Sequence, residues 1–211
     1  NYNNVNGIVN MLTLSRDAGV KRFIFSSTSA VYGNPYFTPT SEDSDPNPMS
    51  PYGLQKLIGE QYCKLYADIY DIETVSLRYF NVFGEGMPTK GSYCSVIGSF
   101  KEKLKNKKPL TIYGNGNQSR DFVYVKDVAK ANLAAAESID VGGGECINIG
   151  TGASTTVKEI ANIFKSPIDF LPKRLEPFQS LSDNKKAKDL LDWTPSVKVL
   201  DWLNENIYSR T

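Results

Sequence analysis

The hydrophobic positions along this chain follow two alternating periods. Apolar residues recur every three to four positions over 3–18 and 51–70, which predicts two amphipathic helices. Short apolar runs at 21–25 and 73–80 predict buried strands. Later in the chain the same patterns predict helices over 96–105, 125–138, 157–164, 185–191 and 199–208, and strands over 110–113, 122–125 and 146–149. Helices alternating with strands indicate an α/β fold with a parallel sheet.

Polar and glycine-rich segments separate these elements. Residues 34–49, rich in Pro, Ser, Asp and Asn, and the glycine-containing segment 81–92 are expected to be loops. The glycines at 142–144 come before a strand, so a turn is expected there. The small hydroxylated residues at 26–29 follow the first strand, and ligands of α/β sheets bind at the carboxyl ends of strands.

Composition narrows the classes of function. Among 211 residues, 24 Lys and Arg nearly balance 23 Asp and Glu, which gives no reason to expect nucleic acid or a membrane surface as a partner. Neither an apolar run of about 20 residues nor a signal-peptide pattern occurs. Cys63, Cys94 and Cys146 form no CxxC pair, so we expect neither a zinc site nor a disulfide framework, and a cytoplasmic location.

The sequence contains no histidine. This excludes Ser-His-Asp and Cys-His catalysis and histidine-ligated metal sites. An acid or base working near neutral pH must then be a perturbed tyrosine, lysine, cysteine or carboxylate.

Tyr52 and Lys56 form the most informative pair of such groups. They are four residues apart, so a helix opened by Pro51 would carry both on one face. A neighbouring ammonium favours the phenolate and lowers the pKa of a tyrosine from its usual value of about 10. The pair therefore predicts proton transfer to and from an alcohol or sugar hydroxyl.

Four further motifs accompany this pair in a fixed order. They are FIFSSTSAVYG at 23–33, LRYFNVFG at 77–84, YGNGNQSRDFVYVKDV at 113–128 and INIGTG at 147–152. Together with the Tyr-Lys pair they resemble the extended short-chain dehydrogenase/reductase family, and most closely its nucleotide-sugar epimerases. The resemblance covers essentially the whole chain.

The resemblance implies a fold in two parts. We expect an α/β fold that comprises the C-terminal part of a Rossmann-type doubly wound parallel sheet and a smaller mixed α/β substrate-binding domain. Residues 1–83 would complete the NAD-binding domain, and 84–211 would mainly form the substrate domain, with segments near 121–150 returning to the sheet. The glycine-rich phosphate loop of the family does not occur in these residues and is expected to precede residue 1. We therefore expect the 211 residues alone to bind NAD weakly or not at all.

Roles for individual residues follow from the same resemblance. Tyr52 aligns with the catalytic acid/base, Lys56 with its partner, and Thr28 with the Ser/Thr that bonds the reacting sugar hydroxyl. The cofactor side of the site would comprise Ser26, Ser27, Tyr52, Lys56, Tyr79 and Phe80. The substrate side would comprise Asn3, Asn81, Val96, Tyr113, Arg120, Lys173, Arg174, Glu176 and Ser180.

One segment departs from the family pattern. Relatives carry Arg-Pro-Gly-Asp where this chain has Lys-Arg-Leu-Glu at 173–176. Gapless alignment puts Lys173 at the arginine position and Glu176 at the aspartate, whereas Arg174 matches only after a shift of one residue. Which of the two cations contacts phosphate stays open at this point.

The implied reaction is NAD-dependent 4-epimerisation of a UDP-hexose through a transient 4-keto sugar. Ser29 and Ala30 stand where dehydratases and decarboxylases of this fold carry acidic residues, so a 4-epimerase is favoured. An epimerase similar to the ADP-heptose 6-epimerases, which share segments like 91–93, a dehydratase, and a non-catalytic nucleotide-sugar-binding relative remain alternatives. The small Ser180, at a position beside the sugar C2 substituent, predicts that N-acetylated hexoses are accepted too. A homodimer formed through the helices at 3–18 and 51–70 is also implied.

Overall fold

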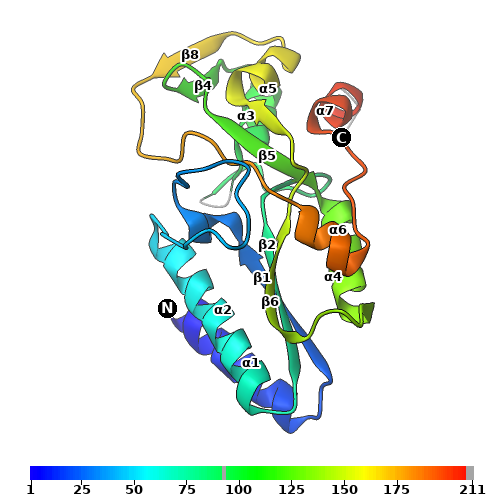
Figure 1. Cartoon of the computed structure of the whole chain (residues 1–211). Helices are drawn as coiled ribbons and strands as arrows, with labels where there is room; N and C mark the ends of the chain where they lie inside the picture. Colours follow the sequence, from blue (N-terminus) through cyan, green and yellow to red (C-terminus); the bar gives the residue numbers. More distant parts are fainter. Residues whose placement is uncertain (92–93, 208–211) are drawn as a thin grey trace.

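A computed structural model describes residues 1–91 and 94–207. Its lower half in Figure 1 is built on a parallel three-stranded sheet in the order β1-β2-β6. The strands are β1 (Arg22–Thr28), β2 (Glu73–Tyr79) and β6 (Gly143–Ile149). In register, Ser27 pairs with Arg78 and Thr28 with Tyr79, so the carboxyl ends of β1 and β2 lie together. The predicted α/β fold with a parallel sheet is confirmed.

Helices cover both faces of this sheet (Figure 1). A π-helical turn, Tyr2–Asn6, leads into α1 (Gly7–Asp17), which packs beside α2 (Pro51–Ile69) on one face. On the other side, α4 (Val125–Glu137) contacts β1 and β2 and packs against α6 (Lys185–Leu191). Buried Val and Leu side chains of β2 pack with Ala131 and Ala135 of α4, which fixes this layer.

The upper half of the molecule contains two smaller sheets. β5 (Ser119–Tyr124) lies between β3 (Asn81–Phe83), which is parallel to it, and β7 (Ser154–Thr156), which is antiparallel. β4 (Leu110–Tyr113) pairs in parallel with β8 (Ile168–Leu171). Three helices complete this half: α3 (Val96–Lys105), α5 (Val157–Ile163) and α7 (Val199–Asn206).

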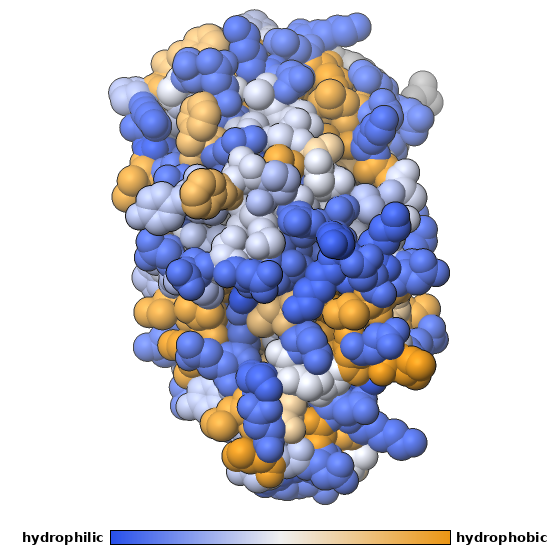
Figure 2. All heavy atoms as spheres, in the orientation of Figure 1, coloured by the Kyte–Doolittle hydropathy of each residue, from blue (hydrophilic) through white to orange (hydrophobic). Residues whose placement is uncertain are grey.

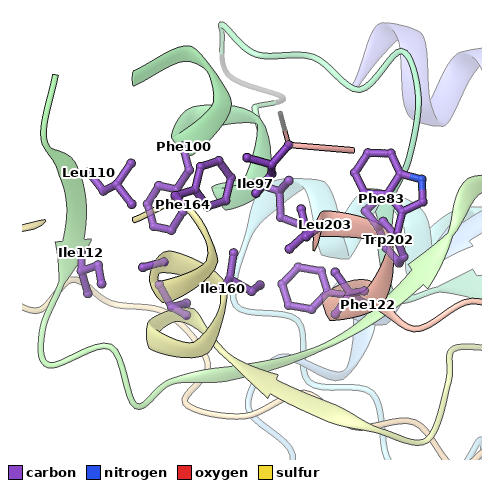
Figure 3. Packing of buried hydrophobic residues seen from close by; sticks show 14 of the residues in the cluster. Phe83, Ile97, Phe100, Leu110, Ile112, Phe122, Ile160, Phe164, Trp202 and Leu203 are labelled. Carbon is purple, nitrogen blue, oxygen red and sulfur yellow. The ribbon is translucent and has the colours of Figure 1, made fainter. Parts of the chain in front are cut away.

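A large apolar cluster holds the upper half together (Figure 3). Phe83 packs edge-on against Trp202 with ring centroids 5.5 Å apart, and Phe100 meets Phe164 in the same manner at 5.5 Å. Edge-to-face aromatic pairs contribute beyond the burial of their area. The cluster joins α3, α5, α7, β4 and β5, and of these α3, α5, β4 and β5 contribute walls of the larger cavity.

Several predicted boundaries were wrong. β1 continues through the hydroxylated run to Thr28, because the backbone of these residues pairs with β2. Asn81–Phe83 is a strand rather than loop, and two of the glycines expected to form a turn, Gly143 and Gly144, begin β6. The short strands β7 and β8 were not predicted.

Other expectations lie outside the described residues or remain untested. Ser92 and Tyr93, part of the segment shared with heptose epimerases, and the predicted end of the last helix at Tyr208 are not described. β6 joins the first sheet although it follows β5 in the chain, but the division of the chain at residue 83 stays a prediction. No helix among residues 1–91 and 94–207 is long and apolar enough to cross a membrane.

Candidate functional site

The carboxyl end of β1 carries the first candidate residue, Thr28. This residue has an extended backbone and caps the 3-10 turn Ser29–Tyr32, where its hydroxyl oxygen accepts a hydrogen bond from the Ala30 N–H at 3.2 Å. Capping uses the oxygen as an acceptor and leaves the O–H proton to be donated elsewhere. Thr28 thus combines a structural role with a hydroxyl that can bind a ligand.

The first turn of α2 lies directly against this 3-10 turn. Ser50 caps the helix by accepting from the Gly53 N–H at 3.0 Å, and Pro51 occupies the first helical position, as predicted. A Cβ on Gly53 would stand 2.6 Å from the Ala30 carbonyl oxygen, so only glycine permits this approach. Tyr52, just before this contact, keeps 44% of its surface exposed.

Lys56 is fixed one turn later on the same helix. Its ammonium donates to the Ser26 carbonyl oxygen at 2.8 Å and lies 4.8 Å from the centre of the Phe25 ring. Burial lowers the pKa of Lys56. The lysine therefore bonds to β1 two residues before Thr28, so the predicted trio of Thr28, Tyr52 and Lys56 comes from two segments that are packed together.

Exposed polar groups continue this site across the neighbouring strand. The Ser26 hydroxyl lies 3.2 Å from the Tyr79 hydroxyl, which donates to the Asn132 side chain of α4 at 2.9 Å. Hydroxyl and ammonium groups arranged in this way suit the ribose hydroxyls and carboxamide of a nicotinamide nucleotide. Ser26, Lys56 and Tyr79 thus fit the nicotinamide half of NAD, the cofactor that the sequence predicts.

Three predicted residues are placed differently from this group. The Ser27 side chain is buried and donates to Glu60, so it is turned away from Ser26. Phe80 is also buried, and it packs with Val31 and Tyr32. Asn3 is exposed on the π-helical turn.

A cavity of about 400 Å³ in the upper half collects most of the predicted substrate residues. Arg120 donates to Glu176 at 2.9 Å inside it, and the Arg174 guanidinium lies 4.4 Å from the centre of the Tyr113 ring. Burial lowers the pKa of Arg120, while Glu176 opposes that change. The predicted residues that line this cavity are Asn81, Val96, Tyr113, Arg120, Arg174 and Glu176.

The structure distinguishes the two cations that the sequence left open. Arg174 lines the large cavity together with Arg120, whereas Lys173 lines a neighbouring cavity of about 260 Å³. Ser180 lies beside Asn81, whose amide donates to the serine hydroxyl at 3.2 Å and to the Asp121 carbonyl at 2.8 Å. The geometry therefore favours Arg174 over Lys173 as the second cation of the large cavity.

Sequence reasoning missed several residues of the site. Gln118 lines both cavities and donates to the Tyr113 carbonyl at 2.8 Å. It belongs to the same motif as Arg120, which was the available signal. Nothing in the sequence marks Asn132 as a site residue, because a polar residue in an amphipathic helix is ordinary. Asn4, rather than Asn3, bonds to α2, through Gln55 at 2.7 Å.

Comparisons with known proteins identify the family of this chain. The profile of the NAD dependent epimerase/dehydratase family matches residues 1–150. A putative UDP-glucose 4-epimerase of Methanocaldococcus jannaschii is 42% identical, over 96% of this chain and 70% of that protein. The predicted family resemblance is confirmed.

Solved structures extend the likeness to the fold. UDP-glucose 4-epimerase from Thermotoga maritima, solved with UDP-glucose, has a TM-score of 0.89 at 37% identity, over 98% of this chain and 68% of that one. UDP-N-acetylglucosamine 4-epimerase from Methanobrevibacter ruminantium has a TM-score of 0.88 at 35% identity, over 98% and 67%. The chain spans about two thirds of the length of these relatives.

Proposed function

Because this chain belongs to the NAD-dependent epimerase/dehydratase family, we propose that it carries the catalytic and substrate-binding residues of a UDP-hexose 4-epimerase. The observation that supports the proposal is the packing of α2 on the end of β1, seen in the bond from Lys56 to the Ser26 carbonyl and in the close approach of Gly53 to Ala30. A second support is the separate cavity with two arginines, of a size suited to a nucleotide diphosphate.

Tyr52 acts as the general acid and base of the reaction. The phenolate takes the proton of the sugar 4-hydroxyl and returns it after the sugar has turned over in the site. Lys56 favours the phenolate by its charge, and the Thr28 hydroxyl bonds the reacting oxygen and orients it. When bound, NAD supplies the reversible acceptance of hydride from C4.

The nucleotide and the sugar are held differently. Arg120 and Arg174 supply guanidinium groups, which match the geometry of phosphate oxygens, and Tyr113 and Gln118 offer contacts for the nucleoside. The sugar must present both faces of C4 in turn, so firm anchoring belongs at the diphosphate. The two arginines of the large cavity would supply this anchor.

Neighbouring residues argue against elimination or decarboxylation. Ser29 and Ala30 form the turn after Thr28, and neither can act as a second acid or base near neutral pH. The Ala30 N–H moreover donates to the Thr28 hydroxyl oxygen, and its carbonyl accepts from the Gly33 N–H at 3.3 Å. The residues after Thr28 thus serve to place the catalytic groups.

Three finer features belong to the same proposal. The small Ser180 beside Asn81 leaves room for an N-acetyl group, so UDP-GlcNAc and UDP-GalNAc are substrates as well as UDP-Glc and UDP-Gal.

Two copies of the chain associate through α1 and α2, which expose several apolar side chains (Met11, Leu14, Leu54, Leu65 and Ile69). In Figure 2 apolar residues are visible at the lower left, the region of these helices in Figure 1, and also at the lower right. A cytoplasmic location is retained because the three cysteines are free thiols.

Replacement of Tyr52 by Phe tests the function directly. Tyr52→Phe should lower the rate of UDP-Glc to UDP-Gal conversion by about 10³-fold or more, because the acid/base is lost, while UDP affinity stays within about twofold. Chromatography of the nucleotide sugars and calorimetry with UDP measure the two quantities. Tyr70→Phe, at the other end of the same helix, is the matched control. Full activity of Tyr52→Phe would contradict the mechanism. UDP-sugar binding without any turnover by the unmodified protein, assayed with NAD shown to be bound, would favour a non-catalytic relative.

A further inference from the structure

A buried ion pair lies beneath the catalytic helix, and the mechanism above does not use it. Glu60 of α2 and Arg78 of β2 are 3% and 4% exposed. The guanidinium donates to both carboxylate oxygens, through Nε at 2.9 Å and Nη2 at 2.8 Å. Burial opposes the charge on Arg78, but the bonds to Glu60 raise its pKa above the usual value, so it stays a cation.

The same carboxylate also bonds to the neighbouring strand. The Ser27 hydroxyl of β1 donates to the Glu60 Oε1 atom that accepts from Arg78 Nε. Ser27 and Arg78 are register partners, and they directly precede Thr28 and Tyr79. One side chain of α2 is therefore tied to both strands at the point where they enter the site.

Glu60 lies on the same helix face as the catalytic residues. It follows Lys56 by four residues and Tyr52 by eight, which is one and about two turns of α-helix. Lys56 bonds to the Ser26 carbonyl, and Glu60 bonds to the Ser27 hydroxyl. Two successive turns of α2 are thus attached to two successive residues of β1.

Further bonds anchor the pair on its other side. Arg78 Nη1 donates to the Tyr32 hydroxyl at 2.8 Å, and Tyr32 donates to Asn148 of β6 at 2.7 Å. The Arg78 guanidinium also stacks 4.8 Å from the centre of the Tyr32 ring. Tyr32 ends the 3-10 turn that Thr28 caps, so the network reaches both ends of that turn.

Stability alone is a weak reason for such a pair. Well-packed apolar side chains in place of a buried ion pair often preserve or increase stability. An apolar interface lacks directional bonds. A carboxylate held by three donors instead fixes both the rotation of its helix about the helix axis and its position along that axis. Positioning matters in catalysis because a displacement of about 1 Å can lower a rate by about 10²-fold.

We propose that the Glu60–Arg78 pair, with Ser27, positions Tyr52 and Lys56 against Thr28, as a device separate from the acid/base groups themselves. The proposal rests on the proposed epimerase function, since it assigns the pair a role in placing that function's catalytic groups. It predicts that loss of the pair affects kcat and leaves binding of the nucleotide, which occurs in the other half of the molecule, unchanged.

The test is the double substitution Glu60→Met with Arg78→Met, which removes the pair without leaving a buried unpaired charge. In the NAD-loaded enzyme, kcat should fall by about 100-fold, while the KM for UDP-Glc stays within about twofold and the Tm is retained. Lys64→Met with Asp68→Met removes an exposed ion pair of the same helix and is the matched control, with unchanged kcat. An unchanged kcat in the Glu60/Arg78 double variant would overturn the proposal.

A second readout does not depend on activity. Amide hydrogen exchange measured by mass spectrometry should be faster over residues 51–60 in the Glu60/Arg78 double variant and unchanged over α1. Equal exchange in both proteins would count against the positioning role of the pair, whether or not the unmodified protein epimerises a UDP-hexose. Failure to epimerise any UDP-hexose would refute only the proposed function.

If the Glu60/Arg78 double variant does not fold, Ser27→Ala tests the positioning role of the pair instead. It removes only the bond from β1 to Glu60 and leaves the ion pair intact. We expect a loss in kcat of about 3- to 10-fold with unchanged KM, and no loss would overturn the proposal.

Discussion

At the scale of single residues, the approach of α2 to the turn after Thr28 requires a glycine at position 53. An added Cβ would meet the Ala30 carbonyl oxygen at 2.6 Å, so α2 would have to move away from the turn after Thr28. Gly53→Ala should therefore lower kcat by at least about tenfold and destabilise the fold by about 1–3 kcal/mol. Gly7→Ala is the control, because its nearest atom lies at 3.9 Å. Steady-state kinetics and thermal unfolding measure both variants, and normal activity of Gly53→Ala would show that the contact is unimportant.

Ser180 carries the second prediction at this scale. Its hydroxyl accepts from the Asn81 amide at 3.2 Å, and the proposed function puts the C2 substituent of the sugar beside this residue. Ser180→Tyr should reduce turnover of UDP-GlcNAc by about 10-fold to 200-fold, as crowding in a substrate pocket does, and spare UDP-Glc. Parallel assays of the two substrates decide the matter. The control is Ser154→Tyr, because Ser154 is exposed. The nearby Ser182 would not serve, because it is buried and bonds to Asp121. Equal losses for both substrates would exclude a role in specificity.

At the scale of elements, α5 depends on a capping box at its start. The Thr156 hydroxyl accepts from the Glu159 N–H at 3.1 Å, while the Glu159 carboxylate accepts from the Thr156 N–H at 2.7 Å. The bonds from Thr156 lower the pKa of Glu159. Such a carboxylate stabilises the fold above its unfolded pKa, and that stability is lost as the pH falls through the lower folded pKa.

Thr156→Ala should consequently decrease the free energy of unfolding by about 1 kcal/mol at pH 7. The difference from the unmodified protein should narrow in acid as the pH falls from the ordinary glutamate pKa of about 4.3 through the lower folded pKa, because Glu159 is protonated in both states only below the folded value. Urea unfolding at a series of pH values measures this, with Ser154→Ala as an exposed control. A difference that stays constant down to pH 3 would contradict the proposed contribution of Glu159.

At the scale of the whole molecule, the exposed apolar faces of α1 and α2 predict self-association. Leu14→Glu with Leu65→Glu should convert a dimer to a monomer, because a charged side chain would be buried in the interface. Sedimentation velocity at micromolar concentration measures the mass. Phe170→Glu, on β8, changes an exposed apolar residue in the other half of the molecule and should leave the dimer intact. An unmodified protein that sediments as a monomer would refute the prediction.

The long helices, the parallel sheet and the grouping of Thr28, Tyr52 and Lys56 were accessible from the sequence. The helices and strands depend on local information, such as a period of 3.6 residues or Pro51 at the start of a helix, whereas Thr28 was grouped with Tyr52 and Lys56 through the family resemblance. The short strands β7 and β8 were not accessible, because three or four residues carry too little periodicity and their pairing partners are distant in the chain.

Tertiary structure alone decided which groups meet across long separations. Arg120 is paired with Glu176, Arg174 rather than Lys173 enters the large cavity, and Ser27 turns inward to Glu60 instead of toward the cofactor side. Side chains alternate across a strand, so Ser26 and Ser27 of β1 point to opposite faces, one exposed and one buried. The sequence by itself thus predicted the type of chemistry, through Tyr52 and Lys56, because a helical spacing is local, whereas packing between distant segments determined the cavity with two arginines and the buried pair beneath α2.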